Sequence, residues 1–142
     1  MREFSVAAAL GTLLLRAAWA PAAVLLGHQL ISRSAYRQPL DFAIHFSGGM
    51  AIAFFAYHAL GCFAPVVGEL RPVGRYLFSF ALACTVGLFW EFGELFSDIV
   101  LRTHIQRTIR GTMRDLIADT TGALLTLALV FLWQLLRGRS RA

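Results

Sequence analysis

The sequence contains no lysine, and it carries little charge for a chain of 142 residues. Thirteen arginines and eight acidic residues give a formal net charge of +5, and charged residues make up only 15% of the chain. Hydrophobic residues reach 58%, with a mean hydropathy of +0.65, whereas a soluble domain has about 45–50% apolar residues. The composition therefore predicts a protein that sits in a membrane, and the missing lysine excludes a lysine nucleophile.

Cysteine is also scarce, and the basic residues do not form a nucleic-acid-binding pattern. Cys62 and Cys84 both fall inside apolar stretches and lack the spacing of a metal or redox motif, so we expect them to be small packing residues. No basic run is interleaved with aromatic residues outside the apolar segments, so no nucleic-acid partner is predicted. Arginines near the ends of apolar segments instead set membrane topology or contact anionic lipid.

Four apolar segments are long enough to cross a bilayer, which takes about 20 residues. They lie at about 4–29, 41–64, 73–96 and 114–136. Long continuous apolar runs satisfy their backbone as helices, so the predicted fold is all-α, a single membrane domain over 1–142 built as a bundle of four antiparallel helices. Arginines divide equally between the two membrane faces. The compact tail "RGRSR" led us to predict both termini on the cytoplasmic side of a bacterial inner membrane.

Ionisable residues are concentrated where the second span begins, the third ends and the fourth begins. Antiparallel crossing brings these three segments to one membrane face, so they are predicted to form a polar pocket. Its predicted members are Asp41, His45, Glu91, Glu94, Arg110, Arg114, Asp115 and Asp119. Charges at this depth need partners or water. We expect Arg16, from the middle of the first span, to extend toward them. At the opposite face Tyr57, His58 and Tyr76 are typical interfacial residues.

Three of these segments carry a family resemblance. "LDFAIHF" at 40–46, "FWEFGELF" at 89–96 and "RGTMRDLIADTTGALL" at 110–125 resemble the VanZ-like family of small membrane proteins, and the related YjdF-like group has a similar ending. The resemblance implies a four-helix membrane fold. It places the family's polar positions on Asp41, His45, Glu91, Arg110, Asp115 and Asp119. Phe42 and Asp119 depart from the family pattern, which usually has lysine and asparagine there, so this pocket is more acidic.

Together these features predict a lipid- or envelope-associated binding or accessory protein with membrane lipid as a partner. One alternative is a membrane enzyme acting on a polar lipid head group. Arg110 and Arg114 would then hold a phosphate, and His45 or one of the acids would serve as general base.

Two further alternatives remain open at this stage. Asp41, His45, Glu91 and Asp119 form a reasonable ligand set for a divalent metal such as Mn, Fe or Zn, although no helix carries two of them at a diagnostic spacing. The pocket could instead be a salt-bridged device that fixes helix packing, in a structural subunit of a larger membrane complex.

Overall fold

The computed structural model describes residues 4–32, 37–106 and 108–139, and within these ranges the chain forms helices and no strand. The first span is α1 (Val6–Leu13), a π-helical segment η1 (Leu14–Ala18) and α2 (Trp19–Ser32). The others are α3 (Arg37–Cys62), α5 (Pro72–Leu101) and α6 (Ile109–Arg139), with a short α4 (Ala64–Val67) after α3. Four helical segments are long and apolar enough to cross a membrane. The predicted all-α bundle of four helices is confirmed.

The helices extend further at the polar face than the apolar segments predicted. α5 continues to Leu101 instead of ending near 96, and α6 begins at Ile109 instead of near 114. The predicted long polar connection between them is therefore only 102–108. Hydropathy marks where the bilayer ends, whereas a helix continues for as long as its backbone hydrogen bonds are satisfied, so the polar ends of both helices remain helical.

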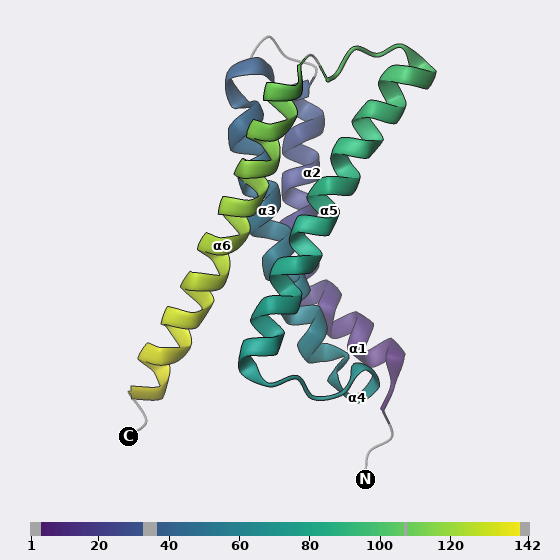
Figure 1. The fold of residues 1–142 in the computed structure, drawn as a ribbon. Coiled ribbons are helices and arrows are strands. Elements are labelled where there is room, and N and C mark those ends of the chain that lie inside the picture. The colour runs from purple at the N-terminus through teal and green to yellow at the C-terminus, as the bar shows by residue number, and fades with distance from the viewer. Residues whose placement is uncertain (1–3, 33–36, 107, 140–142) are drawn as a thin grey trace.

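The second span, α3, is the centre of the bundle. The first span, α5 and α6 all pack against α3, while the backbones of α2 and α6 stay more than 8 Å apart, between Cα atoms, over the described residues. Figure 1 shows α1 beginning and α6 ending at the same end of the bundle, as antiparallel crossing requires. The C-terminal half of α6 diverges there from α1 and α2 (Figure 1).

The interface between α3 and α6 is made of small residues. Ala53 and Ala123 are completely buried, and the core cluster around them adds Tyr57, Ala83 and Leu127. Gly49 and Gly122 lie so close to the opposite helix that an added Cβ would collide with a backbone carbonyl, of Asp119 and Phe46 respectively. Close backbone approach through small residues is the usual packing mode between membrane helices.

The surface of the bundle is as apolar as its interior, as expected of a lipid-facing protein. Exposed side chains include Leu15, Trp19, Phe89, Phe96 and Leu101, each more than 60% exposed. In water such a surface would drive association, but hydrocarbon solvates it. The large residues therefore face outward while small residues fill the contacts between helices.

Two sequence-based expectations about the end opposite the polar pocket are wrong. Tyr57 is only 7% exposed, and its hydroxyl accepts a hydrogen bond from Gln134 Nε2 at 2.7 Å, so it is a core residue and not an interfacial one. Arg16 does not extend toward the acids, because it lines a pocket with His58 and Arg75 at the other end of the bundle. Its position 11 residues into a 27-residue span, counted from Val6, allowed either direction.

Candidate functional site

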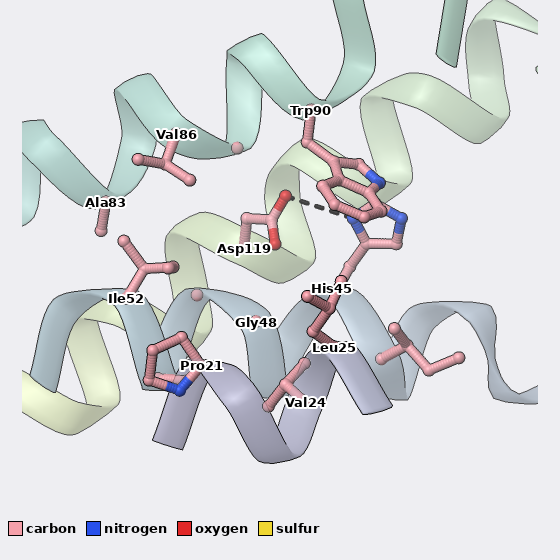
Figure 2. Close-up of a pocket in the computed structure, with 14 residues that line it drawn as sticks. Pro21, Val24, Leu25, His45, Gly48, Ile52, Ala83, Val86, Trp90 and Asp119 are labelled. Carbon is pink, nitrogen blue, oxygen red and sulfur yellow. Dashed lines mark hydrogen bonds and ion pairs between the residues drawn. The ribbon is translucent and has the colours of Figure 1, made fainter. Parts of the chain in front are cut away.

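The centre of the polar pocket is a histidine held between acids from two other helices. His45 on α3 is 6% exposed, and its Nδ1 lies 3.2 Å from Asp119 Oδ2 on α6 and 3.9 Å from Glu91 Oε1 on α5. Figure 2 shows the Asp119 carboxylate directed at the imidazole ring, with Trp90 beside it. Three helices therefore contribute to one buried contact, as the convergence of their polar ends predicts.

Glu91 is the most deeply buried acid of the pocket, with 3% of its surface exposed. Its Oε2 accepts a hydrogen bond from Gln106 Nε2 at 2.9 Å, and the same amide nitrogen also donates to the Glu91 backbone carbonyl at 2.8 Å. Its other oxygen, Oε1, is buried and has no hydrogen-bond partner in the described chain. That oxygen is the one directed at His45, so one unsatisfied acceptor faces the centre of the cluster.

A third acid, Asp115, completes a group suited to a metal ion. His45, Glu91 and Asp115 are all buried, and their potential ligand atoms all lie within 4.8 Å of one another. Asp119 adds a further carboxylate, whose Oδ2 shares a hydrogen bond of 3.2 Å with the same His45 nitrogen, Nδ1, that Glu91 Oε1 faces. Of the four ligands expected from the sequence, Asp41 lines the same cavity but is not part of this donor group, and Arg114 Nη2 donates to its Oδ2 at 3.1 Å.

Arg114 joins the outer acids of the pocket. Its Nε and Nη2 each donate to Asp115 Oδ1 at 3.2 Å, while Nη2 also reaches Asp41. Arg110, by contrast, is exposed and takes part in none of the ion pairs of the described chain. Glu94 accepts a hydrogen bond from Trp90 Nε1 at 3.2 Å at the edge of the pocket. Over the described residues one arginine is therefore paired in a pocket that holds five carboxylates.

The cluster lies between two cavities of different character. A polar cavity of about 140 Å³ opens on the outer side, where Glu91, Asp115, Gln106 and Arg114 are among its lining residues. On the inner side, His45 and Asp119 border an apolar pocket of about 240 Å³ between α2, α3 and α5. Figure 2 shows Val24 and Ile52 lining this apolar side. Water and small ions can thus approach from one side, while the other side is hydrocarbon-like.

Glycines make the space that the Asp119 carboxylate occupies. A Cβ on Gly87 would lie 2.9 Å from Asp119 Oδ2, and one on Gly48 would lie 3.5 Å from Oδ1. The part played by Gly87 is not predicted from the sequence. Its position one helical turn before Glu91, on the same face of α5, is the signal that could have identified it.

A short loop closes the polar cavity from the side of the membrane surface. Arg102 and His104 adopt left-handed backbone conformations, with φ of 56° and 57°, and so turn the chain back after α5. Asp98 fixes this turn, because its carboxylate accepts hydrogen bonds from Thr103 Oγ1 and from the backbone N–H groups of Ile105 and Gln106, all at 2.6–2.7 Å. The turn delivers the Gln106 side chain to Glu91.

Replacing Asp98 with alanine is expected to release this loop. Hydrogen exchange at the Ile105 and Gln106 amides should accelerate by about tenfold or more, because each loses a charge-assisted hydrogen bond. Exchange measured by mass spectrometry in detergent checks this, with Asp98→Asn expected to have a smaller effect because it retains an acceptor oxygen. Unchanged protection of the 102–108 segment in Asp98→Ala would contradict it.

The fold and the site define a small helical membrane protein with a buried histidine–carboxylate cluster. Residues 4–135 match the family described as "Predicted membrane protein (DUF2238)", and the chain belongs to this family. This is the YjdF-like family, so that part of the resemblance is confirmed, whereas the match gives no support to the VanZ-like assignment. The comparisons with curated proteins and with solved structures found no match.

Proposed function

We propose that the protein binds a divalent first-row metal ion at His45, Glu91 and Asp115, with Asp119 as a fourth donor. The observation that carries this proposal is Glu91 Oε1, a buried carboxylate oxygen without a hydrogen-bond partner in the described chain, directed at His45. Leaving such an acceptor unsatisfied is costly, and a bound cation removes that cost.

The separations between donors support the proposal. Two ligand atoms that each lie about 2.0–2.2 Å from one metal are about 2.8–3.1 Å apart at octahedral angles and about 3.3–3.6 Å apart at tetrahedral angles. His45 Nδ1 and Asp119 Oδ2 are 3.2 Å apart, and Glu91 Oε1 is 3.9 Å from the same nitrogen. The first pair, joined here by a hydrogen bond, has a separation that fits a shared metal once Nδ1 carries no proton, and the second needs a shift of less than an ångström.

The charge of the pocket and its surrounding hydrogen bonds point the same way. Five carboxylates surround a single paired arginine, so a cation would reduce their mutual repulsion. Gln106 orients Glu91, and Arg114 orients Asp115, in the manner of groups that hold metal ligands in place. One imidazole with several carboxylates suits Mn, Fe or Zn better than it suits a thiophilic metal.

An anionic head group at Arg110 and Arg114 is a weaker proposal for this pocket. Arg114 is already engaged by Asp41 and Asp115, and a phosphate beside it would face the remaining acids. Arg110 is exposed outside the cluster.

The arginine-rich tail favours both termini in the cytoplasm. In that orientation the cation site would open toward the outer side of the membrane.

Metal analysis of the purified protein tests the proposal. Protein in detergent is loaded with Mn²⁺, Fe²⁺ or Zn²⁺ and passed through a desalting column. Its metal content is then measured by inductively coupled plasma mass spectrometry. We expect about one ion per chain with at least one of these metals, as four donors bind one ion. Glu91→Gln should lose that ion, because a neutral amide replaces the central carboxylate.

Glu69→Gln is the matched control, since it removes the same charge from an exposed position between α4 and α5 and should retain the ion. Elution as a single monodisperse peak establishes that Glu91→Gln is folded. The proposal is overturned if wild-type protein retains none of the three metals, or if Glu91→Gln retains as much as wild type.

A further inference from the structure

A further pocket, lined by positively charged side chains, lies at the end of the bundle opposite the acidic cluster. It has a volume of about 600 Å³, and Arg16, His58 and Arg75 line it together with small and apolar residues of α1 and α3. None of the described residues that line it is acidic. Two arginines of a membrane-spanning bundle thus share a pocket to which the described part of the chain contributes no carboxylate.

Arg75 is held in place by the protein without being neutralised. Its Nε and Nη2 donate to the backbone carbonyl of Tyr57 at 2.9 and 2.6 Å, and its Cζ lies 3.9 Å from the centre of the Tyr57 ring. Gly61 leaves room for the guanidinium, because a Cβ there would lie 2.9 Å from Cζ. These bonds use two of five N–H donors, so three remain for a ligand.

Arg16, the second arginine of this pocket, lies on an irregular stretch of backbone and is not paired with an acid in the described chain. It lies in the π-helical segment Leu14–Ala18, an irregularity that is rare and frequent at functional sites. The side chain is exposed, and it forms no ion pair in the described chain. A charge within a membrane span is costly and calls for a partner, and the described residues that line this pocket include none of opposite sign.

An apolar groove of about 1010 Å³ shares His58 and Arg75 with the cationic pocket. Its walls come from the first span and from α6, with α3 as its floor, because α2 and α6 both pack on α3 while no Cα atoms of α2 and α6 come within 8 Å of each other over the described residues. Trp19, Phe54 and Trp133 are among its lining side chains. Figure 1 shows the C-terminal half of α6 diverging from the first span.

We propose that an anionic phospholipid binds here, with its phosphate between Arg16 and Arg75 and an acyl chain in the apolar groove. A phosphate accepts charge-assisted hydrogen bonds from guanidinium groups, and the groove continues from that position along the hydrocarbon region. The continuity of a cationic pocket with an apolar groove favours a lipid over free phosphate, because free phosphate has no apolar part to occupy the groove. This site is separate from the proposed metal site.

Native mass spectrometry of the full chain with added lipid tests this proposal. Delipidated protein in detergent is titrated with phosphatidylglycerol or phosphatidylcholine of the same chain length. We expect one tightly bound phosphatidylglycerol, and weaker binding of phosphatidylcholine, whose head group carries no net charge. Arg16→Gln should weaken phosphatidylglycerol binding by about tenfold, since it removes one charge-assisted contact.

Arg75→Gln should weaken it by a similar factor, but it also removes a contact with α3, so Arg16→Gln is the cleaner variant. Arg71→Gln is the matched control, because Arg71 is exposed one turn before Arg75, lies outside the residues lining the pocket, and should bind as wild type does. Inorganic phosphate in excess should not displace the lipid. Equal binding of the two lipids, or wild-type affinity in Arg16→Gln, overturns the proposal. Metal content should be unchanged in all three variants, which separates this outcome from that of the metal site.

Discussion

Replacing Gly122 or Gly49 with alanine is expected to destabilise the bundle by about 3 kcal/mol, the upper part of the range for overpacked cores. The added methyl group at Gly122 would collide with the carbonyl oxygen of Phe46, and at Gly49 with that of Asp119. Backbone atoms cannot rotate away as the end of a flexible side chain can. The collision is relieved only if α3 and α6 separate along the interface that forms the core of the bundle.

Reversible unfolding in detergent, titrated with a denaturing surfactant, measures this effect. Gly93→Ala is the matched control, because Gly93 lies within α5 and a Cβ there would meet no atom within 4 Å. It should be neutral or stabilising by up to about 1 kcal/mol, as expected for glycine to alanine in a helix. If Gly122→Ala and Gly49→Ala were as stable as Gly93→Ala, that result would contradict the close contact between the backbones of α3 and α6.

The same substitutions should weaken the proposed metal site. His45 lies on α3 one turn before Gly49, and Asp119 lies on α6 one turn before Gly122. Separating the two helices therefore moves apart the atoms that now lie 3.2 Å from each other. The packing of small residues and the geometry of the donors depend on a single helix–helix contact.

The order of stability of wild type and Glu91→Gln is expected to reverse when the cation is added. A metal that binds only the folded state stabilises wild type by about 2.7 kcal/mol at a concentration 100 times its Kd. Without metal, Glu91→Gln should match or exceed wild type, because it removes one of several neighbouring negative charges and retains the acceptor for Gln106. With metal, wild type should become the more stable of the two.

Thermal unfolding in detergent, with metal and with a chelator, measures both orders of stability. Glu69→Gln should gain as much stability from the metal as wild type does, since its carboxyl group lies outside the pocket. A Glu91→Gln protein that gained the full stabilisation would show that Glu91 is not a ligand. A Glu91→Gln protein far less stable than wild type in chelator would indicate that the buried acid serves packing instead.

The convergence of the polar residues at one end was predictable because it follows from chain direction alone. Four apolar segments joined by connections outside the bilayer must alternate in direction, and His45, Glu91 and Asp119 then fall at the same depth. Which of these groups would contact each other was not predictable. Asp41 on α3 and Asp115 on α6 lie at the same end of the bundle, yet Asp41 pairs with Arg114 while Asp115 lies near His45.

The rotation of each helix about its own axis is the quantity that the sequence left open. In a soluble protein an apolar stripe shows which face turns inward, but lipid is as apolar as the core, so hydropathy does not distinguish the two sides. Small residues mark the inner face instead, and their partners on other helices lie far along the chain. Gly49 and Asp119 are 70 residues apart, and His45 and Asp119 are 74 residues apart. The direction taken by Arg16 was open for the same reason.

By itself, the sequence determined the number of spans, their alternating directions and the end at which the acids gather. These features depend on the length of apolar runs, the thickness of the bilayer and the order of residues along the chain. The tertiary structure alone decided that Glu91 directs an unsatisfied oxygen at His45, and that Arg16 joins Arg75 at the opposite end. Those outcomes depend on helix rotation and on close contacts at glycines such as Gly49, Gly61 and Gly87, which arise only when distant segments pack together.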